Sequence, residues 1–301
     1  MQIRNLIRTA IFCVGSLLVH GAAAAQPVGE GGPLYSELMA LNFQLREETG
    51  QQRASTVVER YRSLVGNLDP CSHPVADAVR ADDLFRATWL AQFYSLSAAD
   101  TDALGCLYRQ FARAGAATDF HTRSYAEALI SMARFAEANV LLEKVEDGDR
   151  PALPQITPDP VPAGNGPWRL LSLQNASQAV VSNWTPVPGR LQVIAVVHPA
   201  CHFSAAALAE ITSSNSLAWL RERMLLLVPA GGHFPGTGML DWNRSHPELP
   251  MQRMYSRDDW KPITSVDTPT FYLMKGAEVV QTFEGWPNVD GVERLRAALA
   301  R

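Results

Sequence analysis

The sequence has no cluster of lysine and arginine, and its charge balance is slightly acidic. Its 301 residues include 26 lysines and arginines against 30 aspartates and glutamates, which gives a net charge of −4. Proteins that hold nucleic acids or anionic membranes do so largely through concentrated positive charge. The sequence therefore argues against a nucleic acid or an anionic membrane surface as the partner.

Long apolar runs are also missing beyond the first 25 residues, so no later segment is long enough to cross a bilayer. Residues 1–25 have the pattern of a signal peptide. Arg4 and Arg8 form a basic start, an apolar run follows, and small residues precede Gln26. We expect this leader to be removed, which takes away two arginines and no acid and lowers the net charge to −6. The expected product is periplasmic or secreted, with no membrane insertion.

Cysteine is scarce, with four residues in the chain. Cys13 lies in the expected leader, so three cysteines remain in a compartment where disulfides form. We predict a disulfide between Cys71 and Cys106, which share one helical region and would gain about 4 kcal/mol by the loop-entropy argument. Cys201 would then be a free thiol. Three buried thiols are the alternative.

The glycine spacing of nucleotide-binding loops is absent as well. The one glycine-rich stretch, GGHFPGTG at residues 231–238, has neither Walker nor dinucleotide-binding spacing. It predicts a surface insertion loop. We expect no cofactor.

Two regions with different hydrophobic periods follow the leader. In residues 34–147, apolar positions recur three and four residues apart, which predicts an all-helical domain of helical hairpins. Its last stretch, SMARFAEANVLLEKVEDGDRP, resembles the second helix of a tetratricopeptide repeat, but no 34-residue period precedes it. A generic antiparallel helical hairpin fits equally well. Residues 148–167 are rich in proline and glycine, and we expect them to be a linker.

Residues 168–301 have the alternating pattern of an α/β domain, with a central mixed sheet flanked by helices. The predicted strands are 168–173, 178–181, 192–197, 224–228, 270–274 and 278–283, and the predicted helices are 203–212, 247–260 and 288–301.

Cys201 stands where a buried strand meets a helix, in the stretch VIAVVHPACHFSAAAL. A helix N-terminus presents unpaired N–H groups and a positive dipole, so it favours a thiolate. Such cysteines have their pKa lowered from about 8.5 into the range of about 3.5–7.5. His198 and His202 flank the cysteine, and either could activate it as an imidazolium. A capping or surface histidine is the alternative.

This order of elements resembles the thioredoxin superfamily, as found in exported thiol:disulfide proteins. The resemblance is carried by CHFS at Cys201–Ser204, by TPT at residues 268–270 before a hairpin, and by Gly285 after the last strand. It implies a thioredoxin-like fold for residues 168–301, with a cis-proline at Pro269 in a loop that faces the cysteine. It also implies that Thr268 and Pro269 bind substrate.

The sequence departs from that family at three positions. Ser204 stands where the resolving cysteine would be, Pro199-Ala200 replaces the usual tryptophan, and Ala195 replaces a buried acid. Without a second thiol, Cys201 can attack a disulfide but cannot release its partner intramolecularly. A serine hydroxyl can still donate a hydrogen bond to the thiolate. We therefore do not expect ordinary dithiol reductase activity.

A metal site is a weaker reading of the same residues. Cysteine and imidazole are suitable ligands for copper or zinc. However, Pro199 interrupts the helix that the His-x-x-x-His spacing would need, so we expect no metal site. The residues with suitable side chains are Cys201, His198, His202, His233 and His246.

Two hypotheses for the function follow. In the first, Cys201 acts as a monothiol in thiol-disulfide exchange with client proteins or small thiols, assisted by His198, His202 and Ser204. In the second, the chain is a non-catalytic protein-binding scaffold with a degenerate thioredoxin fold and a helical interaction domain. Whether the protein is an enzyme depends on the reactivity of Cys201. Trp286, which follows the predicted hairpin, is a further candidate to line a substrate groove, with core packing as the alternative.

Overall fold

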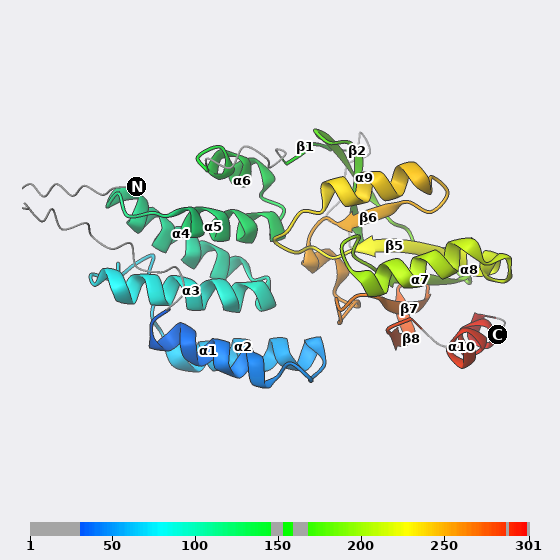
Figure 1. Ribbon diagram of the computed structural model, residues 1–301, viewed down its shortest axis with the longest axis horizontal. Helices are drawn as coiled ribbons and strands as arrows, with labels where there is room; N and C mark the ends of the chain where they lie inside the picture. Colours follow the sequence, from blue (N-terminus) through cyan, green and yellow to red (C-terminus); the bar gives the residue numbers. More distant parts are fainter. Residues whose placement is uncertain (1–30, 146–152, 159–167, 287–288, 300–301) are drawn as a thin grey trace, which may run out of the picture. The chain divides into compact units, whose positions relative to one another are not determined.

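Figure 1 shows the computed structural model, which describes residues 31–145, 153–158, 168–286 and 289–299. The expected signal peptide with Cys13, most of the expected linker, and the start of the C-terminal helix at Asn288 lie outside the described residues. Within the described part, none of the helices combines the length and hydropathy that a membrane span requires.

The first region is helical, as predicted, and consists of α1 to α6 in the described residues (Figure 1). Polar side chains set where several helices begin, because they accept hydrogen bonds from N–H groups in the first turn. Thr49 accepts from Gln52 and Asp77 accepts from Arg80. The bounds are α1 Pro33–Gln44, α2 Gly50–Val65, α3 Ala78–Ser95, α4 Ala98–Arg113, α5 Asp119–Ser131 and α6 Phe135–Leu142.

A disulfide joins Cys71, which lies before α3, to Cys106 in α4, with an S–S distance of 2.04 Å. The predicted pairing is confirmed, and so is the prediction that Cys201 is a free thiol. The bond closes a sequence separation of 35 residues. It restricts the unfolded chain and so favours the folded helical region.

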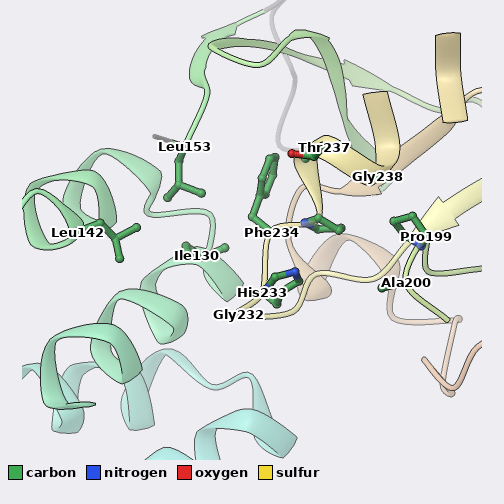
Figure 2. Close-up of a pocket in the computed structure, with 12 residues that line it drawn as sticks. Ile130, Leu142, Leu153, Pro199, Ala200, Gly232, His233, Phe234, Thr237 and Gly238 are labelled. Atoms are coloured by element: carbon green, nitrogen blue, oxygen red, sulfur yellow. The ribbon is translucent and has the colours of Figure 1, made fainter. Parts of the chain in front are cut away.

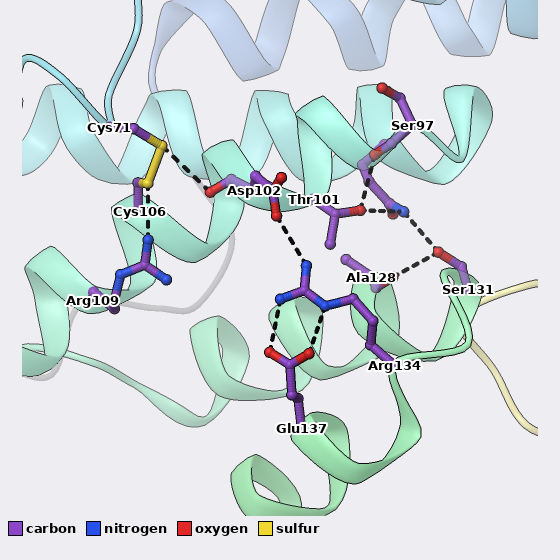
Figure 3. A network of polar contacts seen from close by, with 11 residues as sticks. Cys71, Ser97, Thr101, Asp102, Cys106, Arg109, Ala128, Ser131, Arg134 and Glu137 are labelled. Atoms are coloured by element: carbon purple, nitrogen blue, oxygen red, sulfur yellow. Dashed lines mark hydrogen bonds and ion pairs between the residues drawn. A yellow bond between two sulfur atoms is a disulfide. The ribbon is translucent and has the colours of Figure 1, made fainter.

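Arg134 ties α6 to α4, as Figure 3 shows. It lies in the turn between α5 and α6 and donates to Asp102 in α4 at 2.9 Å and to both carboxylate oxygens of Glu137 in α6 at 2.7 Å. The hydrogen bonds from Arg134 hold the pKa of Glu137 below its ordinary value. Two-pronged contacts of this kind fix geometry as well as adding energy, so the short α6 has a defined direction.

Burial of His121 predicts a pH-dependent stability. Its side chain is 5% exposed, and desolvation lowers its pKa despite a hydrogen bond to Asp82. The unfolded chain, with an ordinary pKa of about 6.5, therefore binds the proton more readily than the folded chain. Stability is then lost as the pH falls through and below about 6.5, by at most about 1.4 kcal/mol per pH unit. Urea unfolding between pH 7.5 and 5 measures this slope.

His121→Gln should reduce the slope and leave the part that comes from His198, whose pKa is also lowered by burial. His73→Gln, at an exposed histidine, serves as the matched control and should leave the slope as it is. Equal slopes in wild type and His121→Gln would show that another group causes the acid sensitivity.

The second region contains a mixed sheet with strand order β1-β3-β2-β6-β5-β4-β7-β8. β4 pairs with β5 and β5 with β6 in parallel, whereas β7 pairs antiparallel to β4 and β8 antiparallel to β7. The strands are β1 Gln155–Pro158, β2 Arg169–Asn175, β3 Gln178–Asn183, β4 Leu191–Val196, β5 Met224–Val228, β6 Met251–Met254, β7 Thr270–Lys275 and β8 Glu278–Glu284. The helices are α7 His202–Ser213, α8 Ala218–Arg221, α9 Gly236–Ser245 and α10 Val289–Leu299, with 3-10 turns at Asn215–Leu217 and Arg257–Trp260. The predicted fold class, a mixed sheet flanked by helices after a helical region, is confirmed.

The sheet is covered on both faces, which explains why β4 is apolar from Val193 to Val196 rather than alternating. Ala195 belongs to the core cluster that includes Leu208 of α7. Its neighbours Ile194 and Val196 belong to a second cluster around Trp260. The buried β4 thus forms a rigid base for the loop that leads to Cys201.

The predicted helix at 247–260 is wrong. This segment instead holds β6 and a 3-10 turn, and the helix α9 comes earlier, at Gly236–Ser245. Proline residues at 247 and 250 disfavour a helix there. The side chain of Asn243 in α9 accepts from the Met251 N–H at 2.7 Å and donates to its carbonyl at 3.1 Å, which holds β6 beside the helix.

β1 lies within the stretch expected to be a linker and pairs in parallel with β3. Residues from Gly31 onward form one compact unit. One apolar core cluster contains both Leu129 of α5 and Leu171 of β2. The helical region therefore packs directly against the sheet.

Candidate functional site

Cys201 lies at the N-cap of α7, directly after the loop that leaves β4. Its backbone is extended (φ −90°, ψ 118°), and its carbonyl accepts from the Ala205 N–H at 2.9 Å. The side chain is half-buried and its thiol is free. The sulfur therefore meets the N-terminal end of the helix while remaining partly accessible to solvent.

The pKa of Cys201 lies below its ordinary value because opposing effects do not cancel. Burial alone would raise the pKa of Cys201. Hydrogen bonding from the side chain of Thr268, from the N–H and hydroxyl of Ser204 and from the N–H of Phe203 lowers the pKa by more than burial raises it. These are donors that a helix N-terminus and its first turn supply to an anion. The thiol itself donates to the Thr268 carbonyl at 3.3 Å, an interaction that favours the neutral form.

Ser204 is buried, with 1% of its surface exposed, one helical turn after Cys201. Its hydroxyl oxygen accepts from the His198 N–H at 3.3 Å. That contact uses an acceptor site of the oxygen and leaves the hydroxyl proton available for the sulfur. The serine thus acts as a fixed hydrogen-bond donor to the sulfur.

The two histidines that flank Cys201, His198 and His202, differ in burial and in their contacts. Burial, and then the nearby His233, lower the pKa of His198, which works against an imidazolium at neutral pH. The Ala200 N–H donates to Nδ1 of His198 at 3.2 Å, so its proton resides on Nε2 in the neutral ring. His202 is exposed and its ring lies 3.8 Å from that of Phe203. Among the described contacts, none joins His202 to the sulfur.

The peptide bond between Thr268 and Pro269 is cis, as predicted, and the Thr268 carbonyl faces Cys201. The strand order, the cysteine at the helix start and the cis-proline beside it form the arrangement that the sequence resemblance implied. The fold is thioredoxin-like. In this thioredoxin-like sheet, β7 begins directly after Pro269, so Thr268 and Pro269 are held at the end of a buried strand.

The loop before the cis-proline is also anchored to the helical region. Asp267 accepts from the Gly50 N–H at 2.9 Å, at the first residue of α2. A carboxylate at a helix N-terminus is stabilised by the helix dipole. The helical region thereby helps to hold the thioredoxin-like loop that faces Cys201.

Trp286 follows Gly285, whose N–H donates to the Pro269 carbonyl at 2.8 Å. Its indole N–H donates to Glu210 in the last turns of α7 at 2.6 Å, and its ring packs against Phe271 at 5.2 Å. No described contact joins Trp286 to Cys201, Thr268 or Pro269. Its predicted place in a substrate groove stays a prediction.

His233 is closer to the site than sequence reasoning placed it, with its ring 6.2 Å from that of His198. Among the described residues, no group of three or more His, Cys, Asp or Glu side chains is arranged to hold a metal ion.

Comparisons with known proteins give little more. No family model matches the chain and no curated protein matches it. Three solved structures are similar at low identity. A candidate thioredoxin from Neisseria meningitidis is 17% identical over 45% of this chain and 89% of its own, with a TM-score of 0.32. The C-terminal domain of an uncharacterized protein from Bacteroides fragilis is 14% identical over 45% of this chain and 95% of its own (TM-score 0.29). A thioredoxin-like protein from Bacteroides caccae is 11% identical over 83% of this chain and 94% of its own (TM-score 0.28).

Sequence reasoning missed the part that residues 232–238 play at the site. Gly238 lies so close to the loop before Cys201 that an added Cβ would come within 2.9 Å of the Pro199 side chain. The glycine is therefore needed for this close approach. The stretch expected to be a surface insertion loop is exposed at His233 and Thr237, but α9 begins within it at Gly236 and it packs against Pro199. Only its glycine content hinted at that contact.

Proposed function

We propose that the protein carries out thiol-disulfide exchange through Cys201 as a single nucleophile, with client proteins or small thiols as partners. The observation that carries the proposal is the free, partly exposed Cys201 at the start of α7 with its pKa lowered by the surrounding donors. A lowered pKa raises the thiolate fraction at neutral pH, and the thiolate is the nucleophile.

The chemistry uses one sulfur. The Cys201 thiolate attacks a partner disulfide, forms a mixed disulfide with one partner sulfur, and expels the other as a thiolate that takes up a proton. Cys201 is oxidised and the expelled sulfur is reduced, so electrons balance. Because residue 204 is a serine, the second step needs an external thiol, which attacks the mixed disulfide and restores Cys201.

Two features support an oxidising compartment, either periplasmic or extracellular. The first is the signal-like pattern of residues 1–25. The second is the Cys71–Cys106 disulfide, a bond that forms and persists where the environment is oxidising.

The first test is the pH dependence of Cys201 alkylation by iodoacetamide, followed by peptide mass spectrometry. We expect half-maximal reactivity at a pH clearly below about 8.5, the ordinary value for a free cysteine. Below the pKa of Cys201 the thiol is neutral, and alkylation slows because only the thiolate is the nucleophile. The same digest reports the Cys71–Cys106 bond.

The urea-unfolded protein supplies the reference pKa, and Cys201→Ser supplies the blank. Labelling that starts only in urea would show an inert buried sulfur and would remove the catalytic proposal.

A non-catalytic scaffold is the second candidate, and a cavity of about 620 Å³ favours it. The cavity lies between the helical region and the loops beside the site, and its lining includes Phe93, which is 59% exposed. Large exposed aromatic side chains are common where proteins meet partners. If Cys201 is inert, this cavity becomes the first place to look for a bound partner.

A further inference from the structure

A separate cavity of about 300 Å³ opens beside Cys201, and Figure 2 shows its walls. Pro199 and Ala200, the two residues before the cysteine, form one side. Ile130 and Leu142 of the helical region form another. The remaining lining residues are Leu153, Gly232, His233, Phe234, Pro235, Gly236, Thr237 and Gly238.

The lining carries no aspartate, glutamate, lysine or arginine. A charged group entering it would lose water without gaining a partner of opposite charge, which is costly. Apolar groups gain about 25 cal/mol for each Å² that they bury. The volume lies at the lower end of the range for ligand pockets, enough for apolar side chains but not for a large ligand.

The walls of this cavity are held in place. The ring of Phe234 packs edge-on against Phe135 of α6 at 5.8 Å. Arg253 donates to the Ile130 carbonyl at 3.2 Å and to the Gly231 carbonyl at 3.0 Å, which joins the helical wall to the loop wall. The cavity is therefore present before any partner arrives, and binding need not pay to form it.

We propose that this cavity selects the partner of Cys201, by taking the apolar side chain of a residue next to a cysteine in a client polypeptide. The inference rests on the proposed function, since it concerns the same sulfur. Pro199 and Ala200 line the cavity and directly precede the nucleophile in the chain. From this adjacency we infer that the neighbour of a cysteine bonded to Cys201 reaches the cavity. Small charged disulfides have no group that suits this lining.

In the selective step, the Cys201 thiolate attacks the cysteine sulfur of the client and forms a new S–S bond with it. The sulfur previously bonded to that cysteine leaves with the electron pair and is protonated by solvent. The apolar neighbour lies in the cavity while the bonds exchange. Its burial lowers the energy of the complex and of the transition state relative to free protein and client.

The test uses three probes of the same form, each releasing 2-thiopyridone on reaction. Two are pentapeptides in which cysteine, activated as its 2-thiopyridyl disulfide, is flanked on both sides by leucine or by aspartate. The third is glutathione activated in the same way. Each rate is divided by the rate of the same probe with free N-acetylcysteine, which removes intrinsic reactivity. We expect the leucine peptide to react about tenfold faster than the other two probes.

Leu142→Glu places a carboxylate in the cavity wall and should abolish this preference. Val140→Glu adds the same charge to the same helix at a side chain that is 56% exposed and outside this cavity, and should keep it. Iodoacetamide labelling of Cys201 should be equal in all three proteins.

The outcomes separate the two proposals. If wild type labels rapidly with iodoacetamide but does not favour the leucine peptide, or favours glutathione, the cavity inference is overturned and monothiol chemistry stands. If Leu142→Glu keeps the preference, selectivity arises elsewhere and the inference also fails. If Cys201 reacts with neither iodoacetamide nor any disulfide probe, the proposed function itself fails.

Discussion

Replacing Ser204 with cysteine should turn a stable mixed disulfide at Cys201 into a short-lived one. Residue 204 lies one helical turn from Cys201, and its side chain already hydrogen-bonds to the sulfur. A thiol in that position attacks the mixed disulfide, releases the partner thiol and leaves a disulfide within the helix start. No external thiol is then needed for release.

The expected effect is large because an intramolecular thiol acts at a high effective concentration. We expect release of a cysteine peptide to be roughly 100-fold faster in Ser204→Cys than in wild type at about 1 mM external thiol. The peptide adduct is prepared first, the excess probe is removed, and release is followed by chromatography and mass spectrometry with and without added thiol.

Ser204→Ala is the matched control, because it removes the hydroxyl without adding a thiol. Its adduct should stay as long-lived as that of wild type, and its Cys201 pKa should rise since a donor to the thiolate is lost. An adduct in Ser204→Cys that is as stable as in wild type would show that residue 204 does not reach the sulfur. The serine at position 204 would then not explain why release from Cys201 needs an external thiol.

The parts of the fold that the sequence predicted are those encoded locally. Residues 193–196 of β4 are apolar because both faces of the strand are buried there, and the position of Cys201 follows from a strand that runs into a helix. The cis bond before Pro269 was implied by the family resemblance, through a short motif. The disulfide followed from counting cysteines in an expected oxidising compartment.

The parts that failed depend on contacts between distant residues. α9 contains glycine at 236 and 238, so its local helix propensity is poor, and β6 is short and flanked by proline. Asn243 holds the two together through hydrogen bonds to Met251. The cavity beside Cys201 has walls from residues 130 to 238, and no local pattern shows that such residues meet.

Arg253 is the clearest example of a residue whose role depends on contacts with distant parts of the chain. In the sequence it is one charged residue in a short polar and apolar stretch, yet in the fold it is fully buried. Burial lowers the pKa of Arg253 to about 9, which still leaves it charged at neutral pH. No carboxylate pairs with it among the described residues. Instead it donates to the carbonyls of Ile130, Gly231, Met254 and Tyr255, and it lies over the rings of Phe135 and Phe234.

Arg253→Met should therefore destabilise the protein by about 3 kcal/mol in urea unfolding. A buried carbonyl left without any donor costs about 1–3 kcal/mol. The Ile130 carbonyl still accepts from the Ala133 N–H at 3.1 Å, so the cost falls on the other carbonyls. Relief from desolvating the charge offsets part of that sum, because a buried ion is costly in its own right. Arg221→Met is the control, since Arg221 also donates to backbone carbonyls, two instead of four, and does so at the end of α7 away from Cys201, through Ile211 and Ser214.

Loss of Arg253 should also change the peptide preference of Cys201, an effect that a general loss of stability would not produce. The guanidinium joins the Ile130 carbonyl of the helical wall to the Gly231 carbonyl at the start of the loop wall. Without it, the two walls of the apolar cavity are no longer held together. At temperatures where the variant is fully folded, the preference for the leucine peptide should fall from about tenfold toward equal rates. The pKa of Cys201 depends on burial and on hydrogen bonds from Thr268, Ser204 and Phe203, and not on Arg253, so this pKa should not change. A variant that is less stable but keeps the full preference would show that the cavity walls do not need this arginine.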